Sequence, residues 1–161
     1  MVRKFMIAAT SSIAVLAGSA TAFAQQYGTR DEARVMLMKA VAAVKADKAK
    51  ALDMFNKGEG GFLDRDLYVF CDNLSDAKQV ANGNPNAKQL IGVDIRTLKD
   101  STGKNFGAEI FAGMQKPEGQ ITEVTYLFPR PGADKTPVQK VGLVTKVSAD
   151  LGCGVGYYKQ N

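Results

Sequence analysis

The chain has few residues of the types that carry out catalysis. Its 161 residues include no histidine and no tryptophan, and only two cysteines, Cys71 and Cys153. This composition excludes Ser-His-Asp and Cys-His catalytic sets, haem attachment through a C-x-x-C-H motif, and zinc sites that combine Cys and His in their usual number. We therefore expect no enzyme, no catalytic residue, no metal site and no cofactor.

Two glycine-rich stretches have spacings that invite a binding interpretation. The stretch Gly58–Gly61 does not follow a strand and open a helix, as a phosphate-binding loop must. The alternating glycines of 152–156 lie within a predicted strand, where they indicate a bulge or the close approach of another chain segment. Neither stretch predicts nucleotide binding.

Two acidic pairs have a spacing that resembles part of a calcium loop. They are Asp64 with Asp66, and Asp72 with Asp76. Both lack the series of oxygen ligands and the final Glu that such a loop requires. Loop solvation or helix capping is the interpretation that we prefer for all four side chains.

The first 24 residues have the pattern of an export signal. Met1–Lys4 is positively charged, Phe5–Leu16 is mostly apolar, and Ala22–Ala24 is an A-x-A cleavage pattern. The apolar run of 12 positions is shorter than the roughly 20 residues that cross a bilayer. We predict cleavage after Ala24, a periplasmic location, and a mature chain that does not span the membrane.

The mature chain is expected to form a single domain over residues 25–161. Removing 24 of the 161 residues leaves 137, a length that buries enough surface to fold alone. The formal net charge falls from +5 to +3 because Arg3 and Lys4 are removed, and the remaining lysines alternate with acids. This pattern disfavours nucleic acid as a partner.

A helical pattern begins near residue 30 and continues to about residue 57. Thr29 and Glu32 have the spacing of a capping box, and Gly58 is placed to end the helix. Apolar residues recur at steps of three and four between these ends. The segment is either one long helix or two helices broken near Asp47. Its apolar face packs on a sheet, and it is also compatible with a dimer interface.

The rest of the chain alternates between extended and short helical patterns. Residues 67–71 are β-branched and aromatic on both faces, which predicts a central strand covered on both sides. The other predicted elements are short helices at 94–99 and 105–114, and strands at 79–81, 120–128, 138–147 and 153–158. This order predicts an α+β domain with an antiparallel sheet.

The two cysteines lie on the first and the last predicted long strands. An exported protein meets an oxidising environment, which favours pairing of Cys71 with Cys153 if these strands are neighbours. We expect a structural disulfide. Two buried free thiols and a redox-active pair are the alternatives, and the second lacks the C-x-x-C spacing that usually tunes a thiol.

The order of several segments resembles the single Cache domain family, of Cache type 2. They are Phe62–Phe70, Leu90–Asp94, Lys99–Gly107, Glu118–Ile121, Tyr126–Pro129, Lys140–Gly142 and Cys153–Tyr158. The resemblance covers about residues 30–161. It implies a PAS-like, five-stranded antiparallel sheet with a long N-terminal helix packed on it. It also implies adjacent first and last strands, and a pocket on one face for small molecules, often carboxylates such as acetate or pyruvate.

A pocket for a small acid needs a cation or hydroxyl donors at the end of an apolar space. On this basis we predict ligand binding by Tyr68, Phe70, Tyr126, Arg130 and Lys140. Each has an alternative interpretation. The three aromatic residues also suit an ordinary core, Arg130 suits a solvated turn, and Lys140 suits the surface.

The expected function is that of a stand-alone periplasmic sensory domain that binds a small organic acid. The family's members are commonly receptor ectodomains followed by a transmembrane helix and an output domain, whereas this chain ends after its last strand. We therefore expect it to act through a membrane receptor or a kinase as its partner, and to be a monomer or a helix-mediated homodimer. The alternative is an accessory protein that keeps the fold without a ligand pocket.

Overall fold

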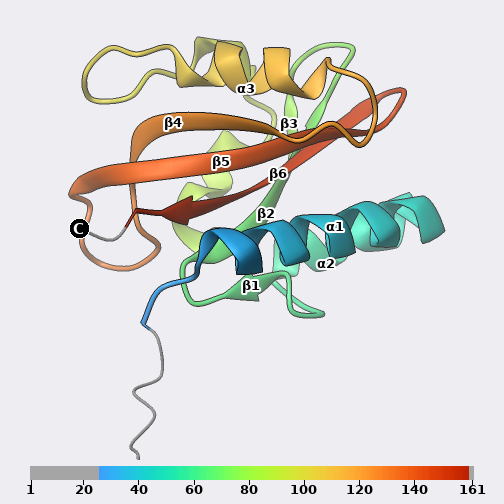
Figure 1. Ribbon diagram of the computed structural model, residues 1–161, viewed down its shortest axis with the longest axis horizontal. Coiled ribbons are helices and arrows are strands. Elements are labelled where there is room, and N and C mark those ends of the chain that lie inside the picture. The colour runs from blue at the N-terminus through green and yellow to red at the C-terminus, as the bar shows by residue number, and fades with distance from the viewer. Residues whose placement is uncertain (1–25, 160–161) are drawn as a thin grey trace, which may run out of the picture.

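The computed structural model describes residues 26–159, in which helices cover both faces of one sheet. Figure 1 shows α1 and α2 on one side of the sheet and α3 on the other. The predicted signal peptide and its cleavage after Ala24 lie outside the described residues. Among residues 26–159, no helix is both long enough and apolar enough to cross a membrane.

The N-terminal helical segment is two helices, α1 (Arg30–Ala46) and α2 (Lys48–Lys57). The predicted capping box is present, because Thr29 accepts a hydrogen bond from the backbone of Glu32 and its own N–H donates to the Glu32 carboxylate. Asp47 has an extended backbone, and its side chain accepts from the Lys50 N–H at 3.0 Å. The break that the sequence left open is therefore real, and Asp47 caps α2.

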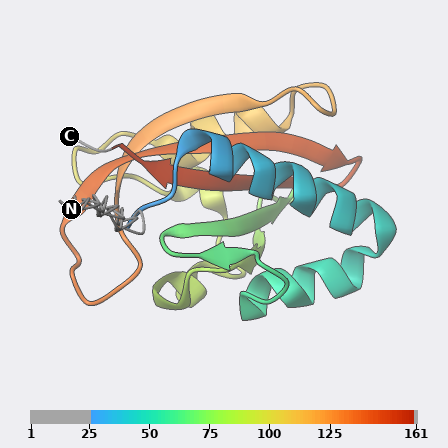
Figure 2. The ribbon, with the colours of Figure 1, turned by 60° about the horizontal axis from the view of Figure 1, so that its bottom comes forward.

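Six antiparallel strands form the sheet in the order β1-β2-β6-β5-β4, with β3 paired to β2 (Figure 2). Their bounds are β1 Leu63–Asp64, β2 Leu67–Asn73, β3 Gln79–Asn82, β4 Thr122–Pro129, β5 Pro137–Ser148 and β6 Leu151–Tyr158. The predicted antiparallel α+β fold is confirmed, with one strand more than the five expected. The added strand is β1, whose two residues are too few to show a periodic pattern.

Alternate side chains of the sheet enter two separate cores. On β5, Val141 and Leu143 pack with the apolar face of α1, whereas Val144 packs on the α3 side. On β2, Val69 faces α1 and Phe70 faces α3, as the period of two requires. The prediction that this strand is covered on both sides is confirmed.

The disulfide between Cys71 and Cys153 joins β2 to β6. The two residues are directly opposite each other in the antiparallel ladder, with Cα atoms 4.0 Å apart, and both are fully buried. The predicted bridge and the predicted adjacency of the first and last long strands are confirmed, and the described residues hold no free cysteine.

Short helices cover the other face of the sheet. They are the 3₁₀ helices η1 (Pro85–Leu90) and η2 (Ile95–Thr97) and the α-helix α3 (Phe106–Met114). A Cβ atom at Gly107 would overlap the backbone carbonyl of Ile95, so glycine permits α3 to lie directly against η2. This close packing leaves a cavity between α3, η2 and the sheet.

Candidate functional site

The cavity on the α3 side of the sheet has a volume of about 30 Å³, which is room for roughly two water molecules. Five aromatic residues dominate its lining: Tyr68, Phe70, Phe106, Tyr126 and Phe128. Five further lining residues are aliphatic or small: Leu90, Ile95, Leu98, Gly107 and Ile110. The remaining three have polar side chains: Asp72, Gln79 and Asn82. The site is thus lined mainly by aromatic rings, with a few polar groups.

Three of the rings pack against one another between α3 and β4. Phe106 stacks on Tyr126 with ring centroids 4.3 Å apart and planes 3° from parallel. Phe128 meets both rings edge-on, at 6.2 and 6.1 Å. Burial raises the pKa of Tyr126 well above its ordinary value, so this phenol stays protonated.

Asp72 is the only acidic side chain in the lining of the cavity, and it is fully buried. Its Oδ1 accepts a hydrogen bond from Gln79 Nε2 at 3.2 Å, and Gln79 Oε1 accepts from Asn82 Nδ2 at 2.6 Å. Asp72 Oδ2 is buried and has no hydrogen-bond partner within residues 26–159. Burial raises the pKa of Asp72 to about 7, against the opposing effect of the Gln79 hydrogen bond.

Lys140 is also buried, with 1% of its surface exposed. Its Nζ donates to the Tyr68 hydroxyl at 2.6 Å and lies 4.0 Å from the centroid of the Tyr68 ring. The rings of Phe128 and Tyr158 lie 5.2 and 5.0 Å from the same nitrogen. Within residues 26–159 no carboxylate forms an ion pair with Lys140.

The glycines of β6 make room for these side chains. A Cβ atom at Gly156 would overlap the Lys140 side chain, and one at Gly154 would overlap the Phe70 ring. The alternating glycines predicted a bulge or a close backbone approach, whereas the structure places side chains against them. The three glycines of β6 on this face, Gly152, Gly154 and Gly156, leave space for side chains from neighbouring elements, and Tyr158 at the end of the strand contacts Lys140.

Arg130 lies outside this cavity. Its Nε is 3.7 Å from Asp66 Oδ2, and its guanidinium lies over the rings of Tyr27, at 4.2 Å, and Tyr158, at 5.0 Å. Asp66, 4% exposed, accepts from the Gly28 N–H at 2.7 Å through its other oxygen. Arg130 thus holds the N-terminal segment against the end of the sheet.

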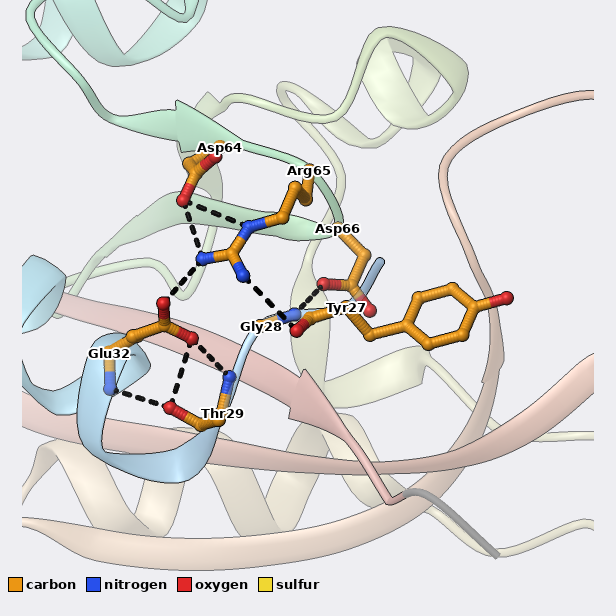
Figure 3. A network of polar contacts seen from close by, with 7 residues as sticks. All are labelled: Tyr27, Gly28, Thr29, Glu32, Asp64, Arg65 and Asp66. Atoms are coloured by element: carbon orange, nitrogen blue, oxygen red, sulfur yellow. Dashed lines mark hydrogen bonds and ion pairs between the residues drawn. The ribbon is translucent and has the colours of Figure 1, made fainter. Parts of the chain in front are cut away.

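A neighbouring network fixes the start of α1 (Figure 3). Arg65 binds the carboxylates of Glu32 and Asp64 at 2.7 Å each and the carbonyl oxygen of Tyr27 at 3.2 Å. Figure 3 shows these contacts converging on the turn between β1 and β2. The network is a structural clamp, because its side chains bind one another and the N-terminal segment and none of them lines the cavity.

Of the five residues proposed from the sequence, the structure brings Tyr68, Phe70 and Tyr126 together in the cavity wall. Lys140 borders the cavity through its contact with Tyr68, and Arg130 is placed elsewhere. Asp72 was missed as a site residue. It continues the alternation of Tyr68 and Phe70 by one step, and this period of two was the available signal.

The two helical layers around an antiparallel sheet define a PAS-like α+β domain with an aromatic-lined cavity on one face. The chain belongs to the single Cache domain 2 family, whose sequence model matches residues 9–157. The resemblance seen in the sequence is therefore confirmed.

Two solved structures share this fold. One is a methyl-accepting chemotaxis protein from Vibrio parahaemolyticus, 21% identical with a TM-score of 0.63, over 80% of this chain and 86% of that one. The other is described as the periplasmic sensor domain of a chemotaxis protein, 22% identical with a TM-score of 0.59, over 81% and 90% of the two chains. At these identities the likeness concerns the fold alone. No curated protein matches the chain.

Proposed function

We propose that this chain is a periplasmic sensory domain that binds a small organic acid, whose carboxylate is received by Lys140 and Tyr68. The observation that carries this proposal is the buried side chain of Lys140, which has no carboxylate partner within residues 26–159. Tyr68 connects this cation to the cavity, because it lines the cavity and also accepts the Lys140 hydrogen bond.

A buried ammonium is costly unless an opposite charge lies beside it. Three aromatic rings around Lys140 supply part of the compensation through cation–π contacts. Two N–H groups of the ammonium remain available as donors, because it has three and Tyr68 accepts from one. A ligand carboxylate would accept from the other N–H groups and from the Tyr68 hydroxyl, and it would supply the missing negative charge.

Binding has to enlarge the cavity. A volume of about 30 Å³ holds roughly two waters, which is less than an acetate ion needs. Tyr68 and Phe128 line the cavity and also contact Lys140, so one of these rings must turn for a carboxylate to reach the ammonium. Rotation of either ring would change the surface of the sheet on the α3 side when the ligand binds.

The signal would pass to a partner protein, for which a membrane receptor or a kinase is our proposal. The outer face of α1 exposes Val35 by 68% and Met38 by 48%, which supports contact with a partner or with a second copy of the chain. The small volume of the cavity favours a second candidate function, that of an accessory protein with the Cache fold and no ligand.

Thermal unfolding of residues 25–161 with a panel of acids tests the proposal. Acetate, propionate, pyruvate and lactate are the probes, and a bound acid at 100 times its Kd stabilises the fold by about 2.7 kcal/mol. Lys140→Met should abolish this stabilisation and still fold, because an apolar side chain of similar length replaces a buried charge. Lys116→Met, at an exposed lysine, is the matched control. No response to any probe would favour the accessory protein.

A further inference from the structure

We propose that Asp72 binds an ammonium group of the ligand, so that the acid recognised by this domain is an aminocarboxylate. This inference rests on the proposed function, because it assigns the ligand's second functional group to the same cavity. Asp72 is four residues from Tyr68 on β2, and both side chains line the cavity. Along a strand this separation places the two Cα atoms about 13 Å apart, so the two side chains start from different ends of the site.

The carboxyl group of Asp72 has unused capacity as an acceptor. It is fully buried, one oxygen accepts a single hydrogen bond from Gln79, and Oδ2 has no partner in the described chain. An ionised carboxylate can accept about four hydrogen bonds. A buried acceptor that lines a cavity and lacks a donor is a position for a donor on the ligand.

The direction of each hydrogen bond in this group is fixed by the backbone. The N–H of Asn84 can only donate, and it donates to Asn82 Oδ1 at 2.9 Å. The amide nitrogen of Asn82 must then donate to Gln79 Oε1, which leaves Gln79 Nε2 to donate to Asp72 Oδ1. Asp72 is therefore held as an acceptor on one oxygen, and its other oxygen is left for the ligand.

A charged donor fits this position better than a neutral one. A carboxylate in a water-poor enclosure is stabilised most by a charge-assisted hydrogen bond. The aromatic residues beside it, Phe70, Phe106 and Tyr126, present π systems that favour a cation and offer no competing donor except the Tyr126 hydroxyl.

The two buried charges of this layer point to the same ligand class. Lys140 and Asp72 lie on the same side of the sheet and form no ion pair with each other or with any other residue in the described chain. A ligand with a carboxylate and an ammonium compensates both. The complex is then electrically balanced, whereas a plain acid or a plain amine leaves one buried charge without a partner.

Calorimetric titration with matched compounds tests this inference. The first series is 4-aminobutyrate, butyrate and butylamine, and the second is alanine, propionate and ethylamine. Within each series the members differ by the presence of the ammonium or the carboxylate. We expect the aminocarboxylate of at least one series to bind at least about tenfold more tightly than its matched acid, a difference of about 1.4 kcal/mol.

The variant Asp72→Asn assigns this preference to the residue. It keeps the oxygen that accepts from Gln79 and replaces the free acceptor by an N–H donor, so the preference for the aminocarboxylate should disappear. The substitution is isosteric and removes a buried charge, and an unchanged or higher melting temperature will show that the variant folds. Asp76→Asn, at an exposed acid four residues further on, is the matched control and should keep the preference.

The outcomes separate this inference from the proposed function. Equal affinities for the aminocarboxylates and the plain acids, or a preference that survives in Asp72→Asn, would overturn the role of Asp72 and leave the acid-binding function in place. Amines that bind as tightly as the aminocarboxylates, in wild type and in Lys140→Met, would support Asp72 and overturn the carboxylate site. No binding by any compound would overturn both.

Discussion

At the scale of single residues, the site is defined by two buried ionisable side chains that lack the partners buried charges normally have. Lys140 is surrounded by rings, and Asp72 has one amide donor. Each costs folding free energy in the ligand-free protein. Side chains that lower stability in this way are typical of binding sites, where the ligand supplies the missing interaction.

Asp72→Asn should stabilise the ligand-free protein at alkaline pH. The folded-state pKa of about 7 lies above the ordinary value of 3.8, so the folded state holds the proton more tightly than the unfolded state. Wild-type stability should therefore fall as the pH rises from about 4 to about 7. Above this window the variant should be more stable by on the order of 2 to 4 kcal/mol.

Urea unfolding of wild type and variant at about pH 4 and about pH 8 measures this difference. The gap should be small at the acidic pH and large at the alkaline pH. Asp76→Asn, at an exposed acid outside the cavity lining, is the matched control. A constant gap across the range would show that Asp72 does not titrate in the folded protein with a raised pKa.

At the scale of elements, local signals predicted the structure well and long-range contacts limited the prediction of the site. The capping residues Thr29 and Asp47 act within three residues of themselves, so the start of α1 could be predicted and a break near Asp47 was one of two alternatives. The shared face of Tyr68 and Phe70 could be predicted from the alternation of side chains along a strand. The hydrogen bond from Gln79 to Asp72 depends on the pairing of β2 with β3, and this pairing has an irregular register between Cys71 and Asp72. Arg130 contacts Asp66, which lies 64 positions earlier in the sequence, and no local sequence pattern predicts this contact.

Asp47→Ala should weaken the junction between α1 and α2. Its carboxylate accepts from the Lys50 N–H and caps α2, and loss of such a cap costs about 1 kcal/mol. Denaturant unfolding measures the loss. Asp53→Ala is the matched control, because Asp53 makes an exposed ion pair with Lys57 that contributes little. Equal losses in the two variants would show that the cap adds nothing beyond a surface charge.

At the scale of the whole molecule, the disulfide and the Arg130 contacts join segments that are far apart in the sequence. The bridge closes a separation of 82 residues between β2 and β6. The contacts of Arg130 hold Tyr27 and the β1–β2 turn at the end of the sheet. None of these side chains lines the cavity, so they should set the stability of the domain without setting its ligand preference.

The double variant Cys71→Ala/Cys153→Ala should lose about 2 to 5 kcal/mol of stability and keep its fold. The hydrogen bonds between β2 and β6 remain, so strand pairing is preserved while the unfolded chain gains freedom. Denaturant unfolding with and without a reductant measures the change. Reductant should destabilise the wild type and leave the variant unaffected. An equal response of both proteins to the reductant would contradict a structural role for the bridge.

Arg130→Ala distinguishes two roles for this residue. The structure shows that Arg130 holds the N-terminal segment through Asp66 and Tyr27, whereas the sequence predicted ligand binding. The variant should lose about 1 to 3 kcal/mol, because the buried Asp66 carboxylate keeps only its bond from Gly28. Hydrogen exchange at the Gly28 amide should become faster, while affinity for the bound acid stays the same. Arg96→Ala, at an exposed arginine paired with Asp94, is the control and should change neither property. Unchanged exchange at Gly28 together with weaker acid binding would instead make Arg130 a ligand-binding residue, and would require the β4–β5 loop to close over the cavity when the acid binds.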